Sequence, residues 1–580
     1  MWGQMASKSK QVKNPAPSPK SHSQDALKYA QDVVAGVIPA CRWVVLATQR
    51  HIDDLEASTS PDFPFRFDED KANKPCKFIE LLPHVAGKWA AMRQLIKLEP
   101  WQKFIVCSLF GWVKKTDGNR RFRKAYICLG RKNAKSTLAA GIALYCLILD
   151  GEFGAQVYAG ATTEKQAAFV FDPAKKMAAA VPALLEKFGV EVNAQTITVL
   201  ETNSKFERLI GNPGDGGSPS CYVCDEYHEH DDSRLYDTMN TGTVAREQPL
   251  GLVITTAGSN TGGPCYAMQR DVERILEGVI EGSNTFGIIY TIDPTDDWTL
   301  ESSLIKCNPN WGVSVNSENV RAEQLEAIQS PEKQNIFKTK HMCVWCTAKS
   351  GFFNVEKWLS LADSTLNMYS DRFKGKDCVK GLDLGSQIDL AAELTVFTEV
   401  IDEKSHYFIF PKFYLPENRA FDPAFQNYQA WVHKKLIVAT EGDEIDYEFI
   451  KRDVLKDAGL FTVKEFCFDK AQAFFFKQQI QAATGIEATE TPQNPMTLSD
   501  PMKWLDAMIR SGRVHHDGNE VMTWMVGNVV SSEDANENVF PRKEKPEFKI
   551  DGVSALLNCL VRIRETLGCV DQEYEEWTGF

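Results

Sequence analysis

The sequence predicts an α/β protein in which a doubly wound parallel sheet is followed by a second β-rich α/β domain. The string GRKNAKST at 130–137 has the features of a phosphate-binding loop, and short β-rich runs alternate with helical stretches between residues 78 and 258. Far downstream, Asp383, Asp469 and Asp551 stand at the ends of strand-like or helical segments. Strands that alternate with helices are typical of parallel sheets covered by helices on both faces.

Length and composition indicate a globular protein of several domains. At 580 residues, one domain per ~150 residues gives two to four domains. Apolar residues make up 43% and charged residues 25%, which excludes wholesale disorder and a membrane protein. The longest apolar run, 138–149, is too short to span a bilayer. The net charge of −13 does not decide for or against nucleic-acid binding, because a basic groove can coexist with an acidic whole.

Composition shifts along the chain predict four segments. We expect a flexible tail and an N-terminal helical extension at 1–60, a phosphate-binding domain at 61–261, a lid and linker at 262–350, and the second β-rich domain at 351–580. The first 25 residues are polar and rich in Pro, Ser and Lys, without the apolar stretch of a secretory signal. This predicts a mobile basic tail on a cytoplasmic protein.

The strands of the first domain are expected at four apolar runs. AYICLG precedes the phosphate loop, and QVYAGA (156–161), CYVC (221–224) and GLVITTAG (251–258) follow it. In the second domain, VKGLDLG, ELTVFTEV, HYFIFPKFYL and EFCFD predict strands, and DGVSALLNCLVRI predicts an apolar helix that begins at Asp551.

The phosphate loop predicts ATP binding. In such loops backbone N–H groups surround the phosphates, a lysine neutralises their charge and a hydroxyl ligates magnesium. Lys135 and Ser136 stand at those positions, but Leu129 replaces the first glycine and Ala134 the glycine before lysine. A chance match is the alternative; if the loop is real, we expect Ala134 to weaken turnover rather than abolish it. The predicted nucleotide contacts are Gly130, Arg131, Lys132, Asn133, Ala134, Lys135, Ser136 and Thr137.

Three further strings complete the predicted ATP site. SCYVCDEYHEH ends a strand in Asp225, which could bind Mg²⁺, and Glu226, which could polarise the attacking water; the alternative is the start of a solvated helix. Thr255 and Thr256 end GLVIT, where they either reach the γ-phosphate or form a simple turn. Gln102, in PWQKF, precedes the loop and could hydrogen-bond an adenine edge.

The three downstream aspartates predict a two-metal nuclease. Phosphodiester cleavage of this kind needs carboxylates that hold two Mg²⁺ or Mn²⁺ ions roughly 3.5 to 4 Å apart. Asp383 lies among apolar residues, where a carboxylate is costly unless it is paired or metal-bound. The alternatives are a turn at Asp469 and an ordinary helix N-cap at Asp551. Asp389 is either an auxiliary acid or a cap.

Two CxxC pairs, Cys221/Cys224 and Cys343/Cys346, offer zinc as another possibility. More than a hundred residues separate the pairs, against roughly 15 to 20 in ribbon-type sites. Residues three apart on a strand also point to opposite faces. We therefore expect buried, reduced thiols.

Together these strings resemble the large subunit of tailed-bacteriophage terminases, in the group similar to that of phage HK97, over nearly the whole chain. The resemblance rests on WQKFI, GRKNAKS, AGATTEKQA, CDEYHEH, ITTAG, GLDLGSQIDL and KIDGVSALL. It implies a P-loop ATPase of the ASCE type and an RNase H-like nuclease. It also implies that Arg131 and Lys135 contact phosphates, that Asp225 and Glu226 bind magnesium and activate water, and that Thr256 couples hydrolysis to movement.

The resemblance further implies a viral DNA packaging motor that cuts concatemeric DNA. The implied partners are double-stranded viral DNA, the portal protein, the terminase small subunit, an optional auxiliary HNH endonuclease, and further copies in a homo-oligomeric ring, a pentamer, on the procapsid in the host cytoplasm. A neighbouring copy would donate an arginine finger, and the candidates are Arg208, Arg234 and Arg246. His516, Asp517 and Asn528 resemble family positions and are expected to be structural or close to DNA.

Two other functions stay open from the sequence. A helicase-type ATPase with a DNA-binding C-terminal domain would show no metal-dependent cleavage. A decayed prophage product would be a structural or interaction protein, but folding alone does not require Lys135, Glu226, Asp383 and Asp551 together.

Overall fold

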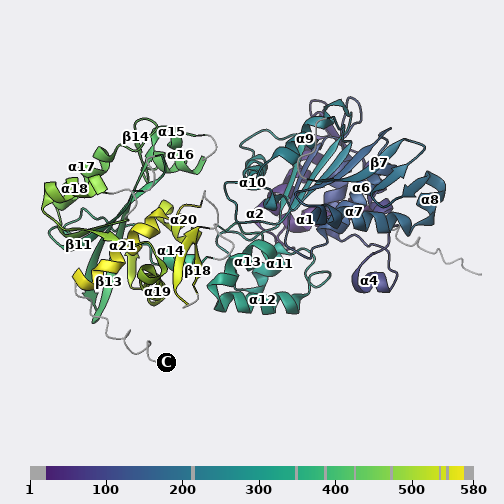
Figure 1. The fold of residues 1–580 in the computed structure, drawn as a ribbon. Helices are drawn as coiled ribbons and strands as arrows, with labels where there is room; N and C mark the ends of the chain where they lie inside the picture. Colours follow the sequence, from purple (N-terminus) through teal and green to yellow (C-terminus); the bar gives the residue numbers. More distant parts are fainter. Residues whose placement is uncertain are drawn as a thin grey trace, which may run out of the picture. The chain divides into compact units, whose positions relative to one another are not determined.

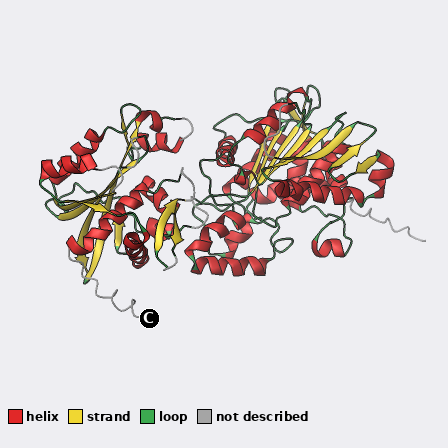
Figure 2. Cartoon of the chain, viewed as in Figure 1, coloured by secondary structure: helices red, strands yellow, loops and turns green. Residues whose placement is uncertain are grey.

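The computed structural model describes residues 21–210, 216–346, 351–384, 388–422, 426–469, 474–534, 537–543 and 548–566. The chain forms two compact units, each described by itself: unit 1 is Met1–Thr256 with Met268–Ser317, and unit 2 is Ala257–Ala267 with Glu318–Phe580. Both units combine helices and strands (Figure 2). The first twenty residues of the expected basic tail lie outside the described part.

Unit 1 contains ten described strands and most of the helices that precede residue 318. The strands are β1 (Phe65–Phe67), β2 (Trp112–Lys114), β3 (Lys124–Cys128), β4 (Gln156–Ala161), β5 (Val190–Val192), β6 (Thr196–Val199), β7 (Ser204–Ile210), β8 (Cys221–Asp225), β9 (Leu250–Thr255) and β10 (Thr285–Ile289). The helices are α1 (His22–Val34), α2 (Arg42–Ala57), α3 (Glu69–Ile79), α4 (Gly87–Ala91), α5 (Pro100–Gly111), α6 (Lys135–Ile148), α7 (Glu164–Ala179), α8 (Pro182–Phe188), α9 (Arg234–Gly242) and α11 (Glu301–Cys307), with 3-10 turns η1 (Tyr227–Glu229) and η2 (Thr243–Ala245). Helices α10 (Pro264–Leu276) and α12 (Ser317–Gln329) cross a unit boundary.

The main sheet of unit 1 has the strand order β10-β3-β9-β8-β4-β7-β6-β5. The strands from β10 to β7 are parallel, and β6 and β5 continue the sheet antiparallel. The four strands expected from the sequence are confirmed, and β9 lies between the strand before the phosphate loop and the strand that ends in Asp225. One strand between these two is the ASCE arrangement, so the predicted fold class of this unit is confirmed.

Helices cover both faces of this sheet. Figure 1 shows α6 and α7 against one face and α9 against the other. Helix α6 is buried almost all round, because its sequence KSTLAAGIALYCLI is apolar all round. On the opposite face a β-carbon on Gly160 would come within 2.8 Å of Met239 on α9, so the glycine lets this helix approach. Among the described residues, no helix is long and apolar enough to cross a membrane.

The N-terminal extension forms two helices, α1 and α2, that pack onto unit 1. Ser21 and Gln24 form a capping box that fixes the start of α1. The hydroxyls of Tyr29 and Tyr290 lie 3.1 Å apart, and the Cys41 thiol donates to the carbonyl oxygen of Ile289 at 3.1 Å. The extension therefore covers the edge of the sheet at β10.

Unit 2 contains nine described strands and the C-terminal helices. The strands are β11 (Asp377–Asp383), β12 (Ala391–Ile401), β13 (Lys404–Pro416), β14 (Val438–Thr440), β15 (Thr462–Asp469), β16 (Ala488–Thr491), β17 (Val514–His516), β18 (Val529–Glu533) and β19 (Val539–Lys543). The helices are α13 (Pro331–His341), α14 (Val355–Ser360), α15 (Glu417–Ala420), α16 (Gln426–His433), α17 (Tyr447–Ala458), α18 (Phe474–Thr484), α19 (Pro495–Ser511), α20 (Glu520–Asn528) and α21 (Asp551–Thr566).

The sheet of unit 2 has the order β14-β13-β12-β11-β15-β16. Strands β11, β12 and β13 form an antiparallel meander, and β15 and β16 join β11 in parallel. Three antiparallel strands extended by parallel ones, with a helix on the central strand, are the RNase H-like arrangement, so this part of the fold prediction is also confirmed. Helix α21 packs directly on β11, because Gly381 has no side chain to hold it away.

The segment expected to be a lid, 262–350, is divided between the two units. Residues 268–317 belong to unit 1, where β10 pairs in parallel with β3. Residues 318–346 belong to unit 2 and carry most of α12 and all of α13. The apolar run TFGII of β10 was not recognised in the sequence as a strand of the sheet. The lid and the domain limits remain predictions.

Candidate functional site

The phosphate loop joins the end of β3 to the start of α6. Lys132 and Ala134 both adopt the left-handed backbone conformation, with φ of 68° and 60°. This conformation costs residues with a β-carbon about 1–2 kcal/mol, and glycine adopts it freely. Ala134 thus replaces a glycine at a position where the backbone favours glycine. The loop keeps its shape only because its surroundings hold it.

A second loop, formed by residues 308–315, holds the phosphate loop from outside. The Asn133 side-chain amide donates to the Gly130 carbonyl oxygen at 3.0 Å and to Asn308 Oδ1 at 2.8 Å. Asn310 donates its backbone N–H to Asn133 Oδ1 at 3.1 Å, and Ser314 donates its hydroxyl to the Lys132 carbonyl oxygen at 2.6 Å. Sequence analysis missed this brace; the polar string NPNW at 308–311 is its only local signal.

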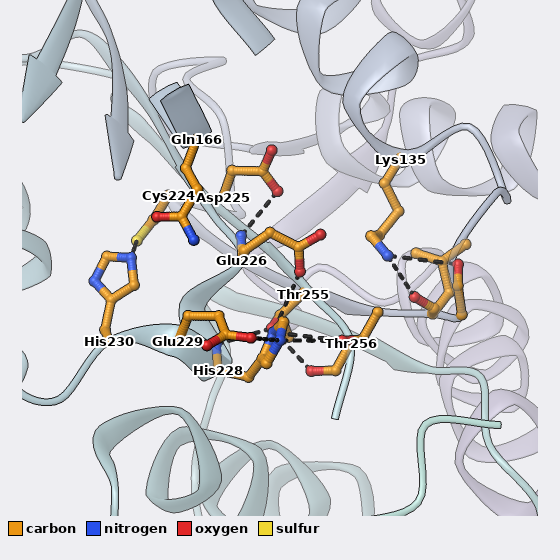
Figure 3. A network of polar contacts seen from close by, with 12 residues as sticks. Lys135, Gln166, Cys224, Asp225, Glu226, His228, Glu229, His230, Thr255 and Thr256 are labelled. Atoms are coloured by element: carbon orange, nitrogen blue, oxygen red, sulfur yellow. Dashed lines mark hydrogen bonds and ion pairs between the residues drawn. The ribbon is translucent and has the colours of Figure 1, made fainter. Parts of the chain in front are cut away.

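Lys135 is turned back onto its own loop. Its buried ammonium donates to the carbonyl oxygen of Leu129 at 2.8 Å and lies 3.4 Å from that of Gly130. Figure 3 shows the side chain directed at these carbonyl groups. A phosphate would have to draw the ammonium away from them.

Ser136 and Asp225 face each other across the ends of two elements. The Ser136 hydroxyl lies 3.5 Å from Asp225 Oδ2. Burial and, after it, the charge of Glu226 raise the pKa of Asp225 to about 7, and Lys135 acts in the opposite direction. Magnesium prefers oxygen ligands of these two kinds, and its charge would offset the buried carboxylate. The residues present therefore fit a magnesium ion.

Glu226 stands in a strained backbone conformation at the end of β8. Its φ of 48° is left-handed, and its N–H donates to Asp225 Oδ1 at 2.8 Å. Non-glycine residues in this region cluster at functional sites. Its buried Oε2 lies 3.2 Å from His228 Nδ1, a contact drawn as a dashed line in Figure 3, and has no hydrogen-bond partner within the described part of the chain.

Thr255 ends β9, Thr256 follows it, and both hydroxyls lie beside the imidazole of His228. Both residues are fully buried. His228 Nδ1 lies 3.0 Å from the Thr255 hydroxyl oxygen and 3.4 Å from that of Thr256. The parallel register sets Thr255 beside Cys128, the last residue before the phosphate loop. The expected coupling residues thus lie between the loop and the acidic pair.

Gln102 serves as a helix cap in the structure. Its Oε1 accepts the N–H of Glu99 at 2.9 Å, which closes a capping box at the start of α5. The neighbouring Trp101 is buried and donates its indole N–H to Asn310 Oδ1 at 2.7 Å. The sequence did not indicate these structural tasks, and an adenine contact by Gln102 stays a prediction.

The three finger candidates have different surroundings. Arg246 lies just before β9, at the opposite end of the strands from the phosphate loop, and donates to the carbonyl oxygens of Ser218, Phe153 and Gly154. Arg208 on β7 lies over the Phe171 ring, 5.5 Å from its centroid. Arg234 is 69% exposed in its side chain and pairs with Asp232. Arg246 is thus bound to backbone far from the site.

Register and packing bring the three nuclease aspartates to one edge of the second sheet. Leu382 on β11 is paired with Phe468 on β15, so the next residues, Asp383 and Asp469, end neighbouring strands side by side. A β-carbon on Gly381 would meet the Ala555 carbonyl, and the Cys559 thiol points to the Val379 carbonyl. Helix α21 therefore runs antiparallel to β11, which places Asp551, one turn before Ala555, above the Asp383 end.

One carboxylate oxygen of Asp551, Oδ2, is buried and accepts no hydrogen bond from the described residues. Burial raises the pKa of Asp551 to about 6, Lys549 acts against this, and Asp389 adds to it. Lys549 forms a short ion pair with Asp389. A divalent cation would satisfy the orphaned oxygen, so the residues present fit a metal.

The carboxylates are not gathered into a ready-made cage. Within the described ranges, no group of three or more His, Cys, Asp or Glu side chains is close enough to hold a metal ion. The Lys549 ammonium lies among the acidic residues instead. Of the two CxxC pairs, Cys221 and Cys224 are buried in β8, and Cys343 is buried in unit 2.

Three polar residues between Asp469 and Asp551 have structural contacts. His516 stacks on Trp358 at 4.2 Å, and Asp517 accepts the Asn519 N–H at 3.0 Å. Asn528 donates its amide to the Lys549 carbonyl oxygen at 2.9 Å. It thereby fixes the backbone two residues before Asp551, a contribution that the sequence did not show.

Comparisons with known proteins match most of the chain. A family model described as the terminase large subunit ATPase domain matches residues 100–274, and one described as the terminase large subunit endonuclease domain matches residues 279–566. Protein YmfN of Escherichia coli (strain K12) is 38% identical over 384 residues, which are 64% of this chain and 84% of that protein. The terminase large subunit of Enterobacteria phage HK97 is 25% identical over 477 residues, 80% of this chain and 90% of the relative. The crystal structure of the HK97 large terminase aligns with a TM-score of 0.41 at 23% identity, covering 85% of this chain and 99% of that one.

Proposed function

This chain belongs to the terminase large-subunit family, with an ATPase domain and an endonuclease domain, and from that premise we propose that it is a viral DNA packaging motor that cuts concatemeric DNA and drives it through the portal into a procapsid. The observation that carries the proposal is the occurrence, in one chain, of a phosphate loop facing an acidic pair and of three aspartates at the edge of a second sheet. The domains imply that the protein uses a nucleotide and divalent metal ions.

In the motor, Lys135 and Arg131 bind the phosphates of ATP, and Gly130, Lys132, Asn133, Ala134 and Thr137 form their cradle. Ser136 and Asp225 hold Mg²⁺, whose charge neutralises the phosphates. Glu226 orients and polarises the attacking water, and its strained backbone supports this role. Gln102 contacts the base, and Thr255 and Thr256 couple hydrolysis to movement.

In the nuclease, Asp383, Asp469 and Asp551 would hold two Mg²⁺ or Mn²⁺ ions. When bound, such a pair would supply the activation of a water and the stabilisation of the leaving oxygen. The chain's own contribution is to bring three carboxylates from two strand ends and one helix start to the same edge. Asp389 assists through its ion pair with Lys549, which keeps it beside Asp551.

We further propose that the protein works as a pentameric ring on the portal, in the host cytoplasm, with a small subunit, double-stranded viral DNA and an optional HNH endonuclease. A neighbour donates Arg208 or Arg234 as the finger; the backbone contacts of Arg246 speak against it. Mixing Lys135→Ala subunits with Arg208→Ala or Arg234→Ala subunits tests the choice. The true finger variant is inactive alone and regains ATP hydrolysis when mixed with Lys135→Ala subunits, because these supply the arginine while the finger variant supplies an intact phosphate loop.

The experiment that tests the two sites measures ATP hydrolysis and plasmid cleavage in Mn²⁺ or Mg²⁺ with the full chain. Lys135→Ala is expected to lose ATP hydrolysis and keep cleavage, and Asp383→Asn and Asp551→Asn are expected to do the reverse. Circular dichroism controls for folding. A wild-type chain that hydrolyses ATP but never cuts DNA would support the helicase-type function instead.

A further inference from the structure

His228 lies between the proposed general base and the proposed coupling residues. Its Nδ1 is 3.0 Å from the Thr255 hydroxyl oxygen and 3.2 Å from Glu226 Oε2. The imidazole is 3% exposed, so water does not replace either contact. Figure 3 shows the ring linked by dashed lines to Glu226 and to the two threonines. The two motifs are therefore joined by one side chain.

The hydrogen-bond directions at Thr255 fix the role of Nδ1. The Thr255 hydroxyl donates its only proton to the Thr256 carbonyl oxygen at 2.9 Å. Its oxygen already accepts the backbone N–H of His228 at 3.1 Å. The remaining contact, with Nδ1, can be a hydrogen bond only if Nδ1 carries the proton. The imidazole therefore presents one N–H to this side of the site.

Three oxygens lie within reach of that single N–H, of which Thr255 Oγ1 and Glu226 Oε2 are the nearest and Thr256 Oγ1, at 3.4 Å, is the farthest. In this structure Thr255 Oγ1 accepts it, and buried Glu226 Oε2 has no hydrogen-bond partner among the residues that the structure describes. A buried carboxylate oxygen without a partner is unfavourable. Because the two acceptors are 3.0 and 3.2 Å from Nδ1, a small rotation of the ring or shift of Thr255 would transfer the hydrogen bond to Glu226.

We infer that His228 is a positioning residue that exchanges its Nδ1–H between Thr255 and Glu226, so that a movement at the end of β9 orients the general base. The inference rests on the proposed function of Glu226 and of the two threonines. It adds the side chain through which the coupling residues act on hydrolysis. The exchange transfers neither a proton nor an electron; only the acceptor of one hydrogen bond changes.

The other ring nitrogen provides a matched control. Nε2 lies 3.1 Å from Glu229 Oε1, at the partly exposed side of the ring, and takes no part in the exchange. Asparagine places its amide N–H two bonds from Cβ, as Nδ1 is placed, whereas glutamine places it near Nε2. His228→Asn should therefore preserve the exchange, and His228→Gln and His228→Ala should remove it.

The first test is steady-state ATP hydrolysis by the full chain with DNA. Loss of one orienting hydrogen bond predicts that His228→Ala and His228→Gln lower kcat about ten-fold with KM for ATP little changed, whereas His228→Asn and the control Glu229→Gln stay within about three-fold of wild type. Equal activity of the Asn and Gln variants, or a change in KM alone, would overturn the inference. A wild type without ATP hydrolysis would count against the proposed function instead.

The second test does not depend on turnover. Nitrogen-15 NMR of histidine-labelled chain, assigned with His228→Asn, reports which ring nitrogen carries the proton. The inference requires Nδ1–H in the wild type and a shift of its resonance in both Thr255→Val and Glu226→Gln. An unprotonated Nδ1, or a resonance that responds to only one of the two substitutions, would contradict it.

Discussion

The carbonyl oxygen of Ala555 lies 2.1 Å from the point where a β-carbon on Gly381 would stand, and the Cys559 sulfur lies 2.7 Å from it. No real side chain fits this space, so the close packing of α21 on β11 depends on the absence of a side chain at Gly381. The same packing sets Asp551 above the end of the strand that carries Asp383.

Gly381→Ala is expected to push α21 from the sheet. Overpacking of this kind costs about 1–3 kcal/mol or more, since a backbone atom has to move. Thermal unfolding should show a destabilised unit 2, and plasmid cleavage should fall while ATP hydrolysis persists. Gly459→Ala is the control, because its nearest contact is 3.4 Å. Equal effects of both substitutions would refute the packing argument.

Ala134→Gly is expected to improve the motor. Glycine removes a left-handed strain of about 1–2 kcal/mol but loses about 0.5–1 kcal/mol through its greater freedom when unfolded, so stability should rise slightly or stay unchanged. Without the methyl group the loop should admit phosphates more easily, which lowers KM for ATP. Ala134→Val should act in the opposite direction on both quantities. If KM for ATP is the same with alanine, glycine or valine at position 134, this position does not limit ATP binding.

Lys549→Met is expected to change metal binding and metal-free stability in opposite directions. The ammonium offsets the repulsion between Asp389 and Asp551, so its loss should lower the melting temperature of the metal-free chain. The same loss removes a cation that repels the metal, and Mn²⁺ affinity should rise about ten-fold. Isothermal titration calorimetry measures this, with Lys434→Met, whose ion pair with Glu520 is exposed, as control. Weaker Mn²⁺ binding would instead make Lys549 an organiser of the ligands.

Acid should destabilise unit 1 through His51. Burial, with a smaller contribution from the Arg121 charge, lowers the pKa of His51 to about 4. Its Nδ1 accepts the indole N–H of Trp112 at 3.0 Å, a bond that protonation would break. Because the folded-state pKa lies below the unfolded value of about 6.5, the stabilisation is complete above pH 6.5 and is lost as the pH falls towards 4.

The full loss amounts to about 3 kcal/mol, from 2.5 pKa units at 1.36 kcal/mol each. Denaturant unfolding between pH 7 and 4 measures it, and His51→Asn, which keeps an acceptor but does not titrate, should flatten this part of the profile. An unchanged profile in the variant would assign the acid sensitivity to other groups.

Local patterns predicted several strands and the positions of Asp225 and Asp469 at strand ends. AYICLG, CYVC and GLVIT carry their apolar signal in five or six consecutive residues, and Asp225 and Asp469 follow such runs directly. The brace by Asn308 and Asn310 could not be predicted, because it joins residues about 175 positions apart in sequence. The same holds for Lys549, whose partner Asp389 lies 160 positions away.

His228 shows which property of a site residue the sequence could not predict. It stands inside a string that the sequence singled out, yet a sequence gives no indication of which atoms surround an imidazole. Gln102 shows the converse, since its residue type suggested a nucleotide contact and the structure adds a helix cap. Residue identity indicates the chemistry available, and only the tertiary contacts decide how it is used.

The two units are joined by more than one stretch of chain. The backbone leaves unit 1 after Thr256, returns at Met268 and leaves again after Ser317. A fragment that ends at Thr256 therefore lacks β10 and the loop of Asn308 and Asn310, which belong to unit 1. Thr256 is also the last residue of unit 1 before the first crossing, so the chain that leaves β9 passes directly into a segment of unit 2.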